Sequence, residues 1–253
     1  FLSQFFRSKY DTALKNYPFI DSRVQITRLE IWVTNRQNRI TTTNNNIRNI
    51  IAIQDLGESQ LTGLPDSEVV VLNPATGIFN QPADSPSDNT NNDYDPDQIK
   101  LGTGLLNSNI REIVTANTGF NTTVSEGQDY SKLENARKLN PNEYTFHPQL
   151  GYISLQQKLA NDEILAVAYQ YTIGDKVYQV GEFSEGVALD PNKGVQQILF
   201  LKLLKATTQR TDLPIWDLMM KNVYSLDLFG AIQQQDFQLN ILYEEPSAGL
   251  KRY

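Results

Sequence analysis

The chain has 253 residues, of which 40% are hydrophobic and 20% charged, a composition typical of a globular protein with a substantial core. Its formal net charge of -7 argues against a nucleic-acid backbone or an anionic membrane surface as the main partner. It has no cysteine and one histidine, which excludes disulfides, thiolate metal sites and multi-histidine metal centres.

The N-terminal segment is expected to be helical. Apolar residues recur at helical spacing over 1–17, with charged residues between them, and Pro18 follows. This pattern predicts an amphipathic helix over 1–17 whose apolar side includes Tyr17, and its residues 2–16 are expected to form a peripheral helix of the fold. Packing of that side on the core, or on a neighbouring domain, is favoured over binding to a membrane surface.

Two strands are predicted next in the chain. Residues 24–33 alternate between apolar and polar side chains over most of their length, and this alternation places Trp32 on the same face as Val24 and Ile26. Residues 47–56 predict a second strand.

The middle of the chain changes character. A short apolar run within 65–73 favours another strand, and 74–98 is rich in Pro, Asn, Asp and Ser, which is typical of a flexible, exposed insertion. The spacing of apolar residues predicts helices over 104–116 and 130–139, the second with Asp129 in the position of an N-cap.

The densest strand signal lies between residues 143 and 183. Segments 144–146 and 152–155 flank Pro148 and Gly151, which predicts a hairpin. Residues 165–173 then alternate strictly, and the apolar start of their second face indicates cover on both sides.

A second hairpin is predicted at Gly174-Asp175, a two-residue turn of type II′ with a return strand over 176–183. The resulting register places Tyr171 opposite Tyr178. Towards the C-terminus, 197–205 predicts a strand or a short buried helix. A helix is expected over 215–224 after Pro214, and a strand over 236–243.

The predicted fold class is mainly β with peripheral helices (α+β), built as an antiparallel, jelly-roll-like β-sandwich. We expect residues 1–253 to form a single soluble domain of a much larger chain, because the sequence starts without methionine and stops without a natural end. No segment has the order of a signal peptide, and the longest apolar run is too short for a membrane helix.

Candidate chemistry is sparse. Five aspartates within 84–97 could bind calcium, but the spacing of an EF-hand is absent and a solvated loop is favoured. Carboxylate pairs for glycoside hydrolysis could come from four glutamates on or near strands: Glu30, Glu143, Glu163 and Glu182. Solvated or ion-paired carboxylates are the more common explanation. His147, which precedes Pro148, is expected to serve the turn rather than catalysis.

Aromatic residues allow a second interpretation. Trp32 and the strand tyrosines could form the sugar platform of a jelly-roll carbohydrate-binding module, although core packing explains most such aromatics. The alternation over 165–173 would also suit a lipid-facing barrel strand, but the long loops and helical segments between strands favour a water-soluble domain.

Five long segments, in order along the chain, carry a resemblance to a known family: Arg23–Asn38 (RVQITRLEIWVTNRQN), Asn46–Glu58 (NIRNIIAIQDLGE), Leu133–Leu155 (LENARKLNPNEYTFHPQLGYISL), Asp162–Phe183 (DEILAVAYQYTIGDKVYQVGEF) and Leu201–Tyr224 (LKLLKATTQRTDLPIWDLMMKNVY). They resemble the SprA family, very large outer-membrane proteins of Bacteroidetes. The segments span most of the chain, and 74–98 has no recognisable counterpart and resembles a variable insertion.

The resemblance implies a non-enzymatic soluble domain of the translocon of the type 9 secretion system, which also serves gliding motility. It implies as partners the remainder of the translocon barrel chain, small outer-membrane companion proteins, a periplasmic plug and secreted cargo proteins. The extracellular face of the outer membrane is favoured over the periplasmic face. No catalytic, cofactor-binding or metal-binding residue is assigned, and the alternative remains a carbohydrate-binding jelly-roll module at the cell surface.

Overall fold

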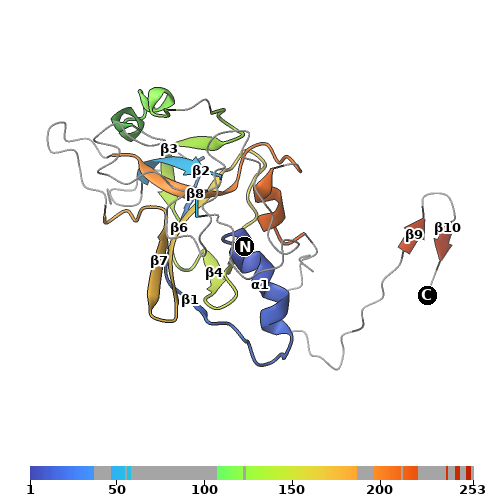
Figure 1. Ribbon diagram of the computed structural model, residues 1–253. Coiled ribbons are helices and arrows are strands. Elements are labelled where there is room, and N and C mark those ends of the chain that lie inside the picture. Colours follow the sequence, from blue (N-terminus) through green and yellow to red (C-terminus); the bar gives the residue numbers. More distant parts are fainter. Residues whose placement is uncertain are drawn as a thin grey trace. The chain divides into compact units, whose positions relative to one another are not determined.

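The computed structural model describes residues 1–36, 47–54, 56–57, 107–121, 124–186, 197–211, 213–221, 238, 243–245 and 249–251 (Figure 1). They fall into two compact units, Phe1–Met220 and Lys221–Tyr253. The predicted strand within 65–73 and the insertion 74–98 with its acidic loop lie outside the described residues. So does most of the predicted strand 236–243.

The first unit is built on one six-stranded sheet. Its strand order is β1 (Val24–Val33), β3 (Tyr130–Lys138), β2 (Ile47–Ile53), β8 (Leu199–Lys205), β6 (Leu165–Ile173) and β7 (Lys176–Val180). Strand β1 also pairs with β6 from Val24–Ile173 to Val33–Leu165. Five strands therefore close into a barrel-like ring, with β7 outside it.

This ring corrects the predicted sandwich. The β-rich class is confirmed, but the strands do not divide into two facing sheets, and the pair β2–β8 is parallel. Closure pairs sheet edges that an open sheet would leave to solvent. Sequence alternation is the same in a ring and in a sandwich, so it could not separate the two.

Both faces of the ring carry apolar cores. One core includes Ile31, Tyr169 and Phe200, and the other includes Trp32 and Leu201. Strand β6 contributes alternate residues to each core, as its sequence predicted. Burial on both sides explains why its second face is rich in alanine.

A bulge in β1 changes the predicted face of Trp32. The register with β6 shifts between Ile26 and Arg28, so that Thr27 is an extra residue. The extra residue moves Val24 and Ile26 to the face of the first core, while Trp32 belongs to the second. The prediction that these three residues share a face is therefore wrong.

Strand β3 replaces the helix predicted over 130–139. It pairs with β2, and a bulge places two residues of β3 opposite Asn49, where Asn135 has a φ of 53°. The bulge brings Leu133 and Ala136 to one face at a spacing of three residues, which imitates a helix. Asp129 caps no helix, because a strand begins at Tyr130, and its carboxylate accepts a hydrogen bond from Ser125 N (2.7 Å).

Both predicted hairpins are confirmed. Strands β4 (Tyr144–His147) and β5 (Tyr152–Leu155) pair antiparallel as a separate two-stranded sheet. Strands β6 and β7 pair in the predicted register, with Tyr171 opposite Tyr178, but β7 ends at Val180 and not at residue 183 as predicted. The turn between them has Gly174 at a φ of 58°, the conformation that its first position requires.

The helices are fewer and shorter than predicted. Helix α1 (Gln4–Leu14) confirms the N-terminal prediction, but it ends before Tyr17. The described part of 104–116 contains only the short 3₁₀ helices η3 (Ser108–Arg111) and η4 (Ala116–Thr118). The expected helix after Pro214 is a 3₁₀ turn, η5 (Pro214–Leu218).

The remaining segments complete the fold. Segment 197–205, left open between strand and helix, forms β8. In the second unit, β9 (Tyr243–Glu245) and β10 (Gly249–Lys251) form an antiparallel pair.

Candidate functional site

Trp32 lies inside the protein. Its side chain has no exposed surface and packs in the second core with Ala166 and Leu201, and the Lys138 Nζ lies 6.0 Å from its ring. A sugar platform needs an aromatic face that is open to solvent. The structure therefore excludes Trp32 as such a platform, and the strand tyrosines Tyr169 and Tyr171 are buried as well.

The four glutamates considered for hydrolysis are each held by a different group. Glu30 contacts Lys138, Glu143 contacts Arg137, Glu182 contacts Arg111, and Glu163 accepts a hydrogen bond from Ala160 N. These contacts explain each carboxylate as part of the framework. None requires a role in catalysis.

A cluster of polar residues around Glu30 connects β1, β3 and β2 to the segment that follows β7. Its carboxylate, 4% exposed, accepts hydrogen bonds from Lys138 Nζ (2.7 Å) on β3 and from Ser184 N (3.0 Å). Arg48 on β2 donates to Ser184 O (2.8 Å). Burial lowers the pKa of Arg48, and the charge of Glu30 opposes this effect. The cluster fixes the chain where it leaves the sheet.

A second ion pair fixes η3 to the ring. Arg111 contacts both oxygens of Glu182 at 2.7 Å, and its guanidinium lies 4.5 Å from the ring centre of Phe200. Glu182 also accepts a hydrogen bond from Phe200 N (3.0 Å), and Arg111 donates to Ile198 O (3.0 Å). This bidentate geometry is among the stronger forms of ion pair.

Glu143 belongs to the turn before β4. Burial alone would raise its pKa, but hydrogen bonds from Asn140 and the ion pair with Arg137 (2.8 Å) outweigh burial, so the pKa of Glu143 is lowered. The stabilised form is therefore the carboxylate.

His147 serves the turn between β4 and β5, as its sequence context predicted. Its Nδ1 accepts a hydrogen bond from Leu150 N (3.2 Å), and its ring stacks on Tyr152 with 5.7 Å between ring centres. Gly151 lies in the same turn, and its carbonyl accepts a hydrogen bond from Leu2 N (2.9 Å). The turn thus anchors the start of α1.

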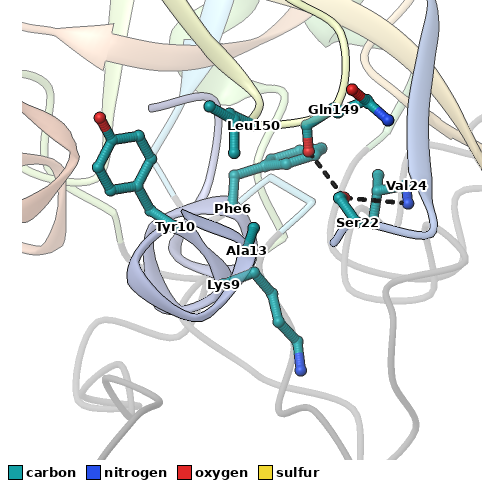
Figure 2. Close-up of a pocket in the computed structure, with 8 residues that line it drawn as sticks. All are labelled: Phe6, Lys9, Tyr10, Ala13, Ser22, Val24, Gln149 and Leu150. Atoms are coloured by element: carbon teal, nitrogen blue, oxygen red, sulfur yellow. Dashed lines mark hydrogen bonds between the residues drawn. The ribbon is translucent and has the colours of Figure 1, made fainter. Parts of the chain in front are cut away.

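A small hollow lies where α1 meets this turn (Figure 2). Phe6, Lys9, Tyr10 and Ala13 of α1 line it together with Leu150, as Figure 2 shows. Its volume of about 10 Å³ is room for one water molecule, far below the size of a ligand pocket. It is a packing gap and not a binding site.

The connection after α1 exposes two large aromatic side chains. Tyr17 is 77% exposed and Phe19 is 69% exposed, on either side of Pro18. With Ile20 these residues form what we call the aromatic turn. The sequence placed Tyr17 on the packed side of a longer helix, so this exposure was missed; Pro18, which cannot continue a helix, was the available signal.

The aromatic turn is held in place by its own main chain. Tyr17 N donates to Leu14 O (3.0 Å), Phe19 N to Asn16 O (3.0 Å), and Asp21 N to Ala13 O (3.0 Å). An ordered turn loses little conformational entropy when its side chains are covered. Exposed aromatics on ordered main chain are typical of interaction surfaces.

Two further observations concern the described part of the chain. Within it, no group of three or more His, Asp or Glu residues is placed to hold a metal ion. No helix within the described ranges is long and apolar enough to cross a lipid bilayer.

The fold and the site together define a small closed-β domain whose buried charged groups build the framework and whose two most exposed described aromatics lie on one ordered turn. Comparison with protein families then identifies the lineage. The model SprA_N, described as motility related/secretion protein, matches residues 4–178, from the first turn of α1 into β7. The chain belongs to this family, and the protein is related to motility or secretion. No curated protein matches the chain.

Proposed function

We propose that this domain is a non-enzymatic scaffold of an outer-membrane protein-export translocon, the type 9 secretion system that also serves gliding motility. The observation that carries the proposal is the family match over 4–178, which covers α1 and six of the strands of the described structure. That match contains four of the five ring strands, and β8 lies beyond its end, so most of the ring belongs to the segment that carries the family signature.

The architecture agrees with a scaffold role. The ring is closed, and buried ion pairs at Glu30 and Glu182 fix its connecting segments. Such a framework keeps a surface patch in a constant orientation. The proposed partners are the remainder of the translocon chain, small outer-membrane companions, a periplasmic plug and secreted cargo, with the domain on the extracellular side.

The aromatic turn is the surface that we assign to the rest of the translocon. Two exposed aromatics are unusual for a solvated turn. Their rings offer a large apolar area that a partner protein can cover. The carbohydrate-binding alternative is not retained, because its best candidate, Trp32, is buried.

The test is a double substitution, Tyr17→Ser with Phe19→Ser, in the full-length protein. Both side chains are exposed, so the domain is expected to fold normally while cargo export falls by about tenfold, as for loss of an interface anchor. The matched control is Val114→Ser, which removes a side chain that is 89% exposed elsewhere. Equal export by both variants would argue against the aromatic turn as the contact.

A further inference from the structure

Among the described residues, ring closure leaves an unpaired sheet edge at strand β7. Strand β3 pairs with only the C-terminal end of β1. Further along the same side of β1, Ile26 N donates to Pro148 O (2.8 Å), and Ile31 O accepts from Leu139 N (2.8 Å). Strand β7, by contrast, stands at the end of the strand order, and among the described residues it pairs with β6 alone. Its outer edge is where this sheet can accept a further strand.

The register shows which main-chain groups face that edge. The pair that flanks a two-residue turn is hydrogen-bonded, and along an antiparallel ladder bonded and non-bonded pairs alternate. Counting from the turn, Val177 opposite Thr172 and Gln179 opposite Gln170 are the non-bonded pairs. The N–H and C=O groups of Val177 and Gln179 therefore point away from β6.

Two observations agree with this assignment. The carbonyl of Gln170 accepts a hydrogen bond from Thr27 Oγ1 (3.3 Å) on β1, so it faces away from β7. Val177 is 60% exposed, as expected for an uncovered edge. Tyr178 holds the strand in place because its ring stacks on Tyr171, with 5.2 Å between ring centres.

We propose that the outer edge of β7 binds an extended segment of a partner polypeptide, which adds a strand through main-chain hydrogen bonds to Val177 and Gln179. Alternating N–H and C=O groups complement another extended backbone, and side chains of the added strand can then select the partner. Strand β7 has neither the proline nor the bulge that often protects an edge.

The size of the edge favours a flexible segment over a second folded copy. Stable contacts between folded proteins bury roughly 1,200 Å² or more in total, whereas this edge presents the main chain of only two residues. An extended peptide can also follow the strand without bringing a whole domain close to the ring. The proposal does not depend on the secretion role proposed above.

The test uses the 253-residue chain and a peptide copy of residues 167–173 (VAYQYTI) with a lysine tail for solubility. We choose this probe because it copies part of β6, the antiparallel neighbour that β7 already accepts. In ¹⁵N spectra, we expect saturable shifts of the amides of Val177 and Gln179. A peptide with the same residues in scrambled order is expected to cause no such shifts.

Val177→Pro removes one outward donor and leaves the ladder to β6 intact, so peptide binding should weaken by about tenfold, whereas Val177→Thr should bind like the wild type. Gln179→Pro provides a second variant if the first does not fold. If about 1 mM peptide causes no amide shifts, any binding is too weak to be useful, and the proposal is overturned. Unchanged binding by both proline variants, or a dimer in sedimentation that these variants abolish, would overturn it too.

Discussion

Arg111 and Glu182 form a bidentate pair whose side chains are 13% and 9% exposed. The sequence offered Glu182 as one of several carboxylates of unknown role. In the folded chain it accepts hydrogen bonds from Arg111 and from Phe200 N, which joins η3 to β8. At the scale of residues, therefore, a carboxylate that the sequence offered as a catalytic candidate holds together segments that lie far apart in the sequence.

Removing one partner of this pair should be costly. Glu182→Leu leaves the guanidinium of Arg111 largely buried without its carboxylate, and we expect a loss of about 3 kcal/mol in the free energy of unfolding. The double variant Arg111→Met with Glu182→Leu should be more stable than the single one. Urea denaturation measures both, and a single variant as stable as the wild type would contradict the account.

The turn before β4 should give the protein a measurable pH dependence. The pKa of Glu143 is lowered on folding, so its contribution to stability is present above the unfolded pKa and is lost as the pH falls through the folded pKa. We expect Glu143→Gln to destabilise the protein at pH 6 and to cost less at pH 3. Denaturation at the two pH values tests this, and a cost that grows towards pH 3 would have the wrong sign.

At the scale of elements, β3 is the clearest departure from the sequence pattern. Its residues favour a helix locally, but pairing with β2 and β1 decides the structure, and the bulge at Asn135 hides the strand period. Where no bulge interrupts the pairing, as between β6 and β7, the register was predicted correctly, although β7 ends three residues earlier than predicted. Ring closure depends on contacts between distant segments, which local patterns do not report.

The sign of the stability change in Asn135→Ala distinguishes the bulged strand from the helix that the sequence predicted. Asn135 is exposed and has a φ of 53°, a conformation that alanine adopts less readily than asparagine, so we expect a loss of about 1 kcal/mol. In a helix the same change would stabilise, because alanine is the better helix former. Increased stability of this variant would therefore reject the bulged strand.

The docking of α1 can be tested at Gly151. A Cβ at this position would overlap ring atoms of Phe6, so Gly151→Ala should cost the strain of a positive φ plus overpacking, about 3 kcal/mol in total. Gly127 has a φ of 85° and open space around it, which makes Gly127→Ala the matched control with the strain alone. Equal losses in thermal or urea unfolding would show that α1 does not pack on this turn.

The candidate site shows where sequence reasoning stops. The chain pattern predicted the helix before Pro18 but extended it too far, so Tyr17 was assigned to the packed side and the exposure of Tyr17 and Phe19 was missed. The open edge of β7 was hidden for a related reason. A hairpin pattern shows that two strands pair, but it does not show which outer edge the rest of the fold covers.

At the scale of the whole molecule, family membership and architecture lead to one account. The match to a motility- and secretion-related family runs from α1 into β7 and contains four of the five ring strands. The ring, which β8 completes, is closed and fixed by buried ion pairs. A framework of this kind suits a domain that holds interaction surfaces in place. Its aromatic turn and its open strand edge provide two such surfaces.

The most direct test removes residues 24–253 from the full-length protein and measures export of type 9 cargo, with the amount of the shortened protein in the outer membrane as control. We expect cargo to be retained in the cell while the shortened protein is still present. Removal of 74–98 alone, the variable insertion, should leave export unchanged. Normal export without 24–253 would contradict the proposed role of this domain in secretion.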